Sequence, residues 1–211
     1  YESKCYYYLN RMEDAFRTNK EVIRYCMDHA SFDRSRALLA EAFNNQGVYW
    51  QELGKRDSAI RVLKSSVDIL QTTRNRSILT SVYINLADCH LQKGDYPLCG
   101  FYYRKALLVA DSLGLGYRDH FAIYSGLAKL YLELENFPEA NEYFVKAEQI
   151  GNSCTPYERY FFSNTRGNYY YNTKEYEKAL DWFRKADRIT EAFPQPLYKA
   201  IVRGNLGEIF I

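Results

Sequence analysis

Small and aromatic residues recur along the chain at intervals of about 40 positions. Five times a small residue is followed three positions later by an aromatic residue or histidine: Gly47/Trp50, Ala87/His90, Ala128/Tyr131, Gly167/Tyr170 and Gly207/Phe210. A spacing of three places both members of each pair on one face of a helix. The pattern therefore predicts five equivalent helices.

A second set of positions follows each of the first four pairs. It contains a small residue, a large one four positions later and a small one three positions after that: Ala59/Leu63/Ser66, Cys99/Tyr103/Ala106, Ala140/Phe144/Ala147 and Ala179/Phe183/Ala186. This spacing predicts a second helix in each repeat. Turn sequences such as LGKRDS and LENFP lie between the two helices. Gly54 and Gly94 are predicted to end the first helix in the left-handed conformation, and Pro97 and Pro138 to lie in the first turn of the second.

Two helices cross closely only where side chains are small. We expect the small residues of the first helix, Gly47, Ala87, Ala128 and Gly167, to meet Ala59, Cys99, Ala140 and Ala179 of the second. Large residues such as Trp50 and Phe144 would then fill the space between successive hairpins. One hairpin cannot bury its own apolar face, so stability should come from stacked neighbours.

The pattern resembles the tetratricopeptide repeat, whose motif is W-x2-L-G-x2-Y…A-x3-F…A. The segment RGNYYYNTKEYEKALDWFRKAD matches it best, followed by LAKLYLELENFPEANEYFVKAE. The resemblance covers about residues 36–211 and implies an all-α fold, a right-handed α-α superhelix of antiparallel hairpins. The period of about 40 exceeds the ordinary 34 residues. In this respect the chain is similar to extended repeats of bacterial regulators and sensors.

The expected organisation is a single domain over residues 1–211. Residues 1–35 would form a degenerate first repeat, with Leu9, Met12 and Phe16 on its first helix and residues 22–30 on its second. Clear repeats are expected at 40–73, 80–113, 121–154 and 160–193, and the first helix of a truncated fifth at 200–211. The chain starts at Tyr1, so we interpret it as a segment of a longer protein with an apolar edge at its C-terminal end.

The charge balance limits the classes of partner, and the cysteine content bears on the cellular compartment. The 28 basic and 26 acidic residues leave a net charge of +2, which argues against nucleic acid or an anionic membrane as partner. No apolar run approaches the roughly 18 residues of a membrane span. The five cysteines include no CxxC pair, which favours free thiols. That pattern favours the cytoplasm and leaves an extracytoplasmic sensor domain open.

Motifs for catalysis, cofactor binding and metal binding are absent from the sequence. There is no GxSxG, Walker A, GxGxxG or HExxH motif. His90 occupies the repeat position of Trp50 and Tyr131, so we interpret it as a packing residue. Cys26 and His29 have the spacing of metal ligands but no second pair beside them. We therefore predict no catalytic residue, no cofactor, no metal and no enzymatic activity.

Candidate binding residues lie on the first helix of each repeat, away from its packing face. They are Asn44, Asn45, Val48, Asn85, Asp88, Ser125, Lys129, Asn164, Asn168 and Tyr171. An amide both donates and accepts hydrogen bonds, so recurring asparagines can hold the backbone of an extended peptide. They can equally bond locally within the hairpins, and both interpretations stay open. The lysine and asparagine set that some family members use to hold a C-terminal carboxylate is incomplete.

The sequence thus favours a scaffold that binds a protein or an extended peptide on the concave face of the superhelix, within a larger bacterial regulatory or sensor protein. The first alternative is self-association, as a homodimer, through the open C-terminal end. The second is an RNA-binding helical repeat, which would need a basic inner surface that the inner positions do not provide.

Overall fold

The computed structural model describes residues 2–9, 11–74, 76–150, 154–192 and 196–209. Within these ranges the chain is helical and contains no strand, which confirms the all-α fold class. The chain divides into two compact units, residues 1–115 and 116–211. The single-domain organisation expected from the sequence stays a prediction. Phe193 and Phe210, which the repeat pattern includes, lie outside the described residues.

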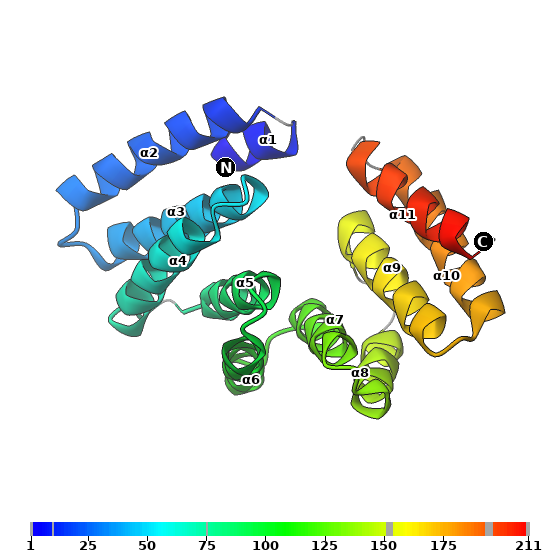
Figure 1. Ribbon diagram of the computed structural model, residues 1–211. Helices are drawn as coiled ribbons and strands as arrows, with labels where there is room; N and C mark the ends of the chain where they lie inside the picture. The colour runs from blue at the N-terminus through cyan, green and yellow to red at the C-terminus, as the bar shows by residue number, and fades with distance from the viewer. Residues whose placement is uncertain (1, 10, 75, 151–153, 193–195, 210–211) are drawn as a thin grey trace. The chain divides into compact units, whose positions relative to one another are not determined.

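The first unit contains two helical hairpins preceded by two further helices, the first of which is short. Its helices are α1 (Glu2–Tyr8), α2 (Met12–Asp28), α3 (Asp33–Glu52), α4 (Arg56–Gln71), α5 (Leu79–Gln92) and α6 (Tyr96–Ser112). Helix α3 packs against α4, and α5 against α6 (Figure 1). Each pair carries one copy of the repeat pattern. Helix α3 begins earlier than the expected repeat start at residue 40.

The second unit repeats this arrangement. Its elements are α7 (Tyr117–Glu133), α8 (Phe137–Ile150), α9 (Pro156–Asn172), α10 (Tyr176–Ile189), the short 3-10 helix η1 (Thr190–Ala192) and α11 (Pro196–Glu208). Helices α7 and α8 form one hairpin, α9 and α10 the next, and α11 packs against α10 (Figure 1). Helix α11 buries Tyr198 and Val202 but exposes Leu197 and Ile201. Helix α11 therefore has exposed apolar side chains, and the apolar edge expected at this end of the chain stays a prediction.

The N-terminal segment differs from its prediction. Met12, Phe16 and Val22 all lie on the single helix α2, whereas the sequence suggested a break between Phe16 and Val22. The residues between them, RTNKE, contain neither glycine nor proline, so nothing interrupts the helix. Helix α2 is fixed to α3 by Asn19, whose buried Nδ2 donates a hydrogen bond to the Ala42 carbonyl oxygen at 2.9 Å.

In two of the hairpins, α3 with α4 and α9 with α10, the helices cross closely at a glycine whose nearest partner differs from the one we expected. A Cβ atom added at Gly47 would lie 2.6 Å from the side chain of Leu63, and one added at Gly167 would lie 2.5 Å from the ring of Phe183. The nearest neighbours of these glycines are thus the large residues of the second helix, not Ala59 and Ala179. Leu63 and Phe183 are fully buried. The missing side chain on one helix makes the space that the large side chain of the other fills.

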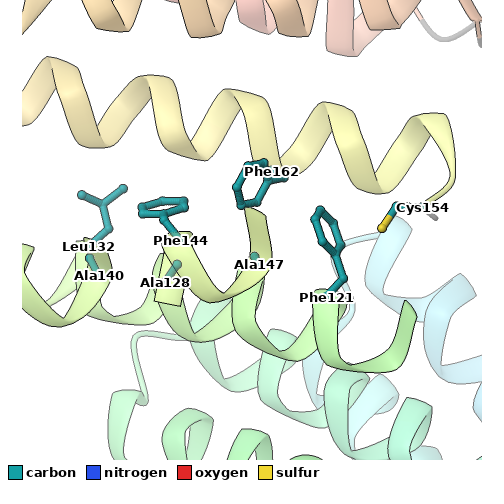
Figure 2. Packing of buried hydrophobic residues seen from close by; sticks show 8 residues of the cluster. All are labelled: Phe121, Ala128, Leu132, Ala140, Phe144, Ala147, Cys154 and Phe162. Carbon is teal, nitrogen blue, oxygen red and sulfur yellow. The ribbon is translucent and has the colours of Figure 1, made fainter. Parts of the chain in front are cut away.

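The core of the second unit shows the same interdigitation. Phe144 and Ala147 of α8 lie between Ala128 of α7 and Phe162 of α9 (Figure 2). The rings of Phe144 and Phe162 are 5.7 Å apart, centroid to centroid, in an edge-to-face arrangement that aromatic pairs favour. Successive hairpins are therefore joined by aromatic side chains that enter from both.

The turns inside the hairpins share one hydrogen-bonding motif. In all four, the residue after the left-handed position donates its N–H to the carbonyl five residues earlier; the pairs are Lys55 to Trp50, Asp95 to His90, Asn136 to Tyr131 and Glu175 to Tyr170. Gly54 and Gly94 adopt positive φ angles of 69° and 74°, as predicted. Glu135 and Lys174 adopt the same conformation without being glycine. The hairpin geometry therefore imposes the left-handed conformation even on residues for which a positive φ angle is unfavourable.

His90 is confirmed as a packing residue. Its side chain is buried and stacks on the ring of Tyr102, with centroids 5.4 Å apart. Its Nδ1 atom lies 3.3 Å from Oδ2 of Asp95. Burial lowers the pKa of His90 and outweighs the opposing effect of the Asp95 carboxylate. The neutral imidazole is therefore the form that fits the fold.

The close crossing generates a stability prediction. We expect Gly167→Ala to lower the free energy of unfolding by about 1–3 kcal/mol, because the new methyl group overlaps the Phe183 ring. Gly207→Ala is the matched control, since Gly207 holds the same repeat position on α11 and has no atom within 4 Å of an added Cβ. Urea denaturation followed by circular dichroism measures both. Equal effects of the two substitutions would contradict the close crossing.

His90 generates a prediction on pH. Its folded-state pKa lies below the ordinary value of 6.5, so the unfolded chain binds the proton more tightly. The neutral His90 therefore supports the full free energy of unfolding above about pH 6.5, and this stability is lost as pH falls through the folded-state pKa. A His90→Tyr variant, which places a tyrosine where Tyr131 and Tyr170 stand in later repeats, should lose less stability than the parent between about pH 7 and 5. Identical pH profiles would show that His90 is not the responsible group.

Candidate peptide-binding surface

The ten predicted binding residues lie on the first helix of each hairpin. In the first unit they are on α3 and α5, and in the second on α7 and α9. Each of the ten residues is half-buried. The structure therefore groups them into two surfaces, one in each unit.

In the first unit the surface is organised by a pair of amides. Asn85 of α5 donates a hydrogen bond from Nδ2 to Oδ1 of Asn44 on α3, at 2.9 Å. Gln51 of α3 donates from Nε2 to the backbone carbonyl oxygen of Asn85 at 3.3 Å. These bonds connect the first helices of successive hairpins. Asn45 and Val48 lie on the same helix as Asn44.

The second unit contains the same pair one repeat interval apart. Asn205 of α11 donates from Nδ2 to Oδ1 of Asn164 on α9, at 2.9 Å, and lies 3.5 Å from Oδ1 of Asn168. The donor stands two residues, and the acceptor three residues, before the small residue of its own repeat, as Asn85 and Asn44 do. These bonds join successive repeats, so they differ from the local bonding within a hairpin that the sequence left open. Each bond uses one amide hydrogen and one lone pair, so it does not exhaust the hydrogen-bonding capacity of either side chain.

The other predicted residues are held in different ways. Asp88 accepts a hydrogen bond from the hydroxyl of Tyr103, whose pKa is raised well above its ordinary value by burial and by the Asp88 charge. The Oγ atom of Ser125 is buried and has no hydrogen-bond partner among the described residues. The ring of Tyr171 lies 5.8 Å from that of Tyr176, centroid to centroid. Lys129 shares α7 with Ser125.

Arg166 is a central residue that the sequence reasoning missed. It is 4% exposed, and its guanidinium carbon lies within 5.0 Å of the ring centroids of Phe144, Tyr169 and Tyr170. Its Nη1 donates to Oδ1 of Asn141 on α8 at 2.8 Å, and its Nε is 3.4 Å from Oε1 of Glu148. Arg166 therefore fixes α9 to α8 by charge and by stacking.

A signal for Arg166 does exist in the repeat. The residue just before the small residue is Gln46, Leu86 or Leu127 in the first three copies and Arg166 in the fourth. A charged residue in a column of otherwise uncharged ones indicates either a surface position or a buried pair. The repeat pattern could not decide between these two, because Asn141 and Glu148 come from another hairpin.

Metal binding has no candidate cluster in the described part of the chain. No group of three or more histidine, cysteine, aspartate or glutamate side chains there could hold a metal ion. None of the helices it contains is long and apolar enough to cross a membrane. The Cys89 thiol is buried, and burial raises its pKa to about 12, so it stays protonated at neutral pH.

Comparison with known proteins identifies the repeat. Models of the tetratricopeptide repeat match residues 78–153 and 163–193, which together make up just over half of the chain. No curated protein matches the sequence.

Three similar solved structures have the same fold at low identity. The structure of BtubC from P. vanneervenii is 19% identical, with a TM-score of 0.72 over 94% of this chain and 83% of that one. A putative kinesin light chain from Podosopora anserina with nearly identical TPR-like repeats is 16% identical, with a TM-score of 0.58 over 92% and 94% of the two chains. A STAND protein with a tetratricopeptide repeat sensor from Pyrococcus horikoshii is 17% identical, with a TM-score of 0.62 over 96% of this chain and 34% of that one.

The matched models, the repeated hairpins and the similar solved structures agree. Such repeats generally form non-catalytic scaffolds for protein interactions, and they support that role here. The chain belongs to the tetratricopeptide repeat family.

Proposed function

We propose that the chain binds an extended segment of a partner protein on the amide-rich faces of its first helices. The observation that carries this proposal is the pair of hydrogen-bonded asparagines that recurs in both units, Asn44 with Asn85 and Asn164 with Asn205. The four asparagine side chains are half-buried, and the other predicted binding residues lie on the first helices of the same units.

The chemistry of the amide pairs supports recognition of a peptide backbone. An amide already oriented by one hydrogen bond loses less conformational freedom when it binds a ligand. Its remaining N–H and carbonyl groups match the alternating acceptors and donors of an extended chain. The surface would therefore select for an extended backbone with little net charge rather than for a charged terminus.

A regulatory or sensory context is part of the proposal. It rests on the repeat length of about 40 residues, which is similar to that of bacterial regulators and sensors. The STAND protein among the similar structures carries a tetratricopeptide repeat sensor, and this chain spans about a third of that protein. The chain would then be the partner-binding segment of a larger bacterial protein.

Binding can be tested with peptides selected on the folded chain from a random displayed library. We expect Asn45→Ala in the first unit or Asn168→Ala in the second to weaken a selected peptide about tenfold, the cost of an unpaired buried polar group. Neither residue is the acceptor in the 2.9 Å amide pairs, so the melting temperature should be unchanged. Titration calorimetry measures the affinity.

Arg184→Ala is the matched control for this test, because Arg184 is exposed on the second helix of its hairpin, α10. It should leave the affinity unchanged. Failure to select any peptide, or selected peptides that tolerate both asparagine variants, would contradict the proposed surface.

Self-association is the second candidate function, supported by the edge of α11. Leu197 is 65% exposed and Ile201 is 41% exposed. Gly207 stands at the position where Gly47 and Gly167 receive a large side chain, yet nothing described lies within 4 Å of an added Cβ there. This edge could receive the same edge of a second copy and form a homodimer.

Sedimentation at increasing protein concentration tests this second candidate. If the edge mediates dimers, the parent chain should show a concentration-dependent dimer that Ile201→Asp abolishes, because a charge cannot be buried without a partner. Leu108→Asp is the control, since Leu108 is 65% exposed on α6. A monomer at all concentrations, or a dimer that Ile201→Asp leaves intact, would exclude it.

A further inference from the structure

The second unit contains a pocket of about 460 Å³ on a different set of residues from the amide surface. Its apolar walls include Phe121 of α7, Phe162 of α9 and Trp182 of α10. Figure 2 shows Phe121 and Phe162 pointing toward each other from α7 and α9. Their ring centroids are 5.2 Å apart. Pockets of about 300–1,000 Å³ with mostly apolar walls are typical of small-molecule sites.

The pocket exists because one aromatic residue of the repeat is missing. Four positions before the small residue the first three repeats carry Phe43, Tyr83 and Tyr124, whereas the fourth carries Ser163. In the second and third hairpins this aromatic lies 6.1 Å from an aromatic of the second helix, Tyr102 or Tyr143. Trp182 holds the equivalent position in the fourth hairpin, but its counterpart is Ser163, which also lines the pocket. The absent ring leaves the space.

Two further departures from the repeat place positive charge on the same pocket. Eight positions before the small residue, the buried Leu39 and Leu79 and then His120 are followed by Arg159. Near the end of the second helix, Asp68, Leu108 and Gln149 are followed by Arg188. Arg159 and Arg188 both line the pocket. The Nε atom of Arg159 is buried and has no hydrogen-bond partner among the described residues.

The remaining charges leave the pocket positive. Lys185 also lines it, with its ammonium 4.2 Å from the centroid of the Trp182 ring. Glu148 is the acidic residue among the lining residues, and its Oε1 lies 3.4 Å from Nε of the buried Arg166. The described lining residues thus include three cations and one carboxylate, and that carboxylate is already paired with Arg166.

We propose that this pocket binds a small organic anion, an apolar body that ends in a carboxylate or a phosphate. The body packs against Phe121, Phe162 and Trp182, and the anionic group accepts a hydrogen bond from Arg159 Nε. Arginine is suited to this role because its planar fork matches both carboxylate and phosphate. The site is independent of the peptide surface, because Ser163 and Arg159 belong to no amide pair.

Trp182 provides the signal for a direct test. The chain has two tryptophans, so Trp50→Phe leaves Trp182 as the only tryptophan, which is excited selectively at wavelengths that tyrosine does not absorb. Hexyl phosphate and hexanoate serve as anionic probes, and 1-hexanol and inorganic phosphate as controls that lack the charge or the apolar body. We expect a saturable change in Trp182 emission with at least one anionic probe, at a concentration about tenfold below any effect of the controls. The tighter of the two anionic probes identifies the head group.

Variants decide whether the change comes from this pocket. Arg159→Gln should weaken the better probe about tenfold, whereas Arg184→Gln, on the exposed face of α10 and not among the lining residues, should not. Ser163→Tyr should restore the missing ring and abolish binding while the chain stays folded. Hexanol binding as tightly as the anions, or binding that survives both Arg159→Gln and a folded Ser163→Tyr, overturns the proposal. If Ser163→Tyr does not fold, Arg159→Gln against Arg184→Gln decides alone.

Discussion

A small residue at one position of each first helix, glycine in α3 and α9 and alanine in α5 and α7, is the constraint on which the fold depends. Gly47 and Gly167 leave room for Leu63 and Phe183, which are fully buried in the crossing of their hairpins. Because the large residue fills the hairpin itself, neighbouring aromatic residues remain to join one hairpin to the next, as Phe144 and Phe162 do. Close packing of this kind transmits the position of each helix to the following one.

That packing also positions the polar groups. Once the first helices of successive hairpins lie side by side, Asn44 reaches Asn85 and Asn164 reaches Asn205 at the same distance of 2.9 Å. The turns are equally determined by the hairpin, because Glu135 and Lys174 accept the left-handed conformation that Gly54 and Gly94 adopt at no steric cost. Residues that depart from the repeat pattern can then be interpreted one by one. Ser163 and Arg159 both line the pocket of the second unit, and the hairpin that carries them keeps the fold of the others.

The repeat spacing was sufficient to predict the helical hairpins, the glycine turns and the packing role of His90, because each follows from positions within one or two helices. Two features depend on contacts that the spacing of the repeat does not contain. The alanines at 59 and 179 are small and buried, so the pattern favoured them over Leu63 and Phe183 as partners of the glycines. The continuity of helix α2, by contrast, could have been predicted, because no glycine or proline lies between Phe16 and Val22. Arg166 is buried only because Asn141, Glu148 and three aromatic rings from two hairpins surround it. For the predicted binding residues, the sequence indicated on which helix face they lie. It did not indicate that asparagines of successive repeats are hydrogen-bonded to each other.

A double-mutant cycle on Gly47 and Leu63 tests the central constraint most directly. Free energies of unfolding would be measured for Gly47→Ala, Leu63→Ala, the double variant and the parent chain. If the missing side chain exists to admit Leu63, the new methyl group should cost far less once Leu63 is truncated, with a coupling energy of about 1–3 kcal/mol between the two sites. Effects that add to within about 0.5 kcal/mol would contradict the account, because they would mean that the two positions do not compete for the same space.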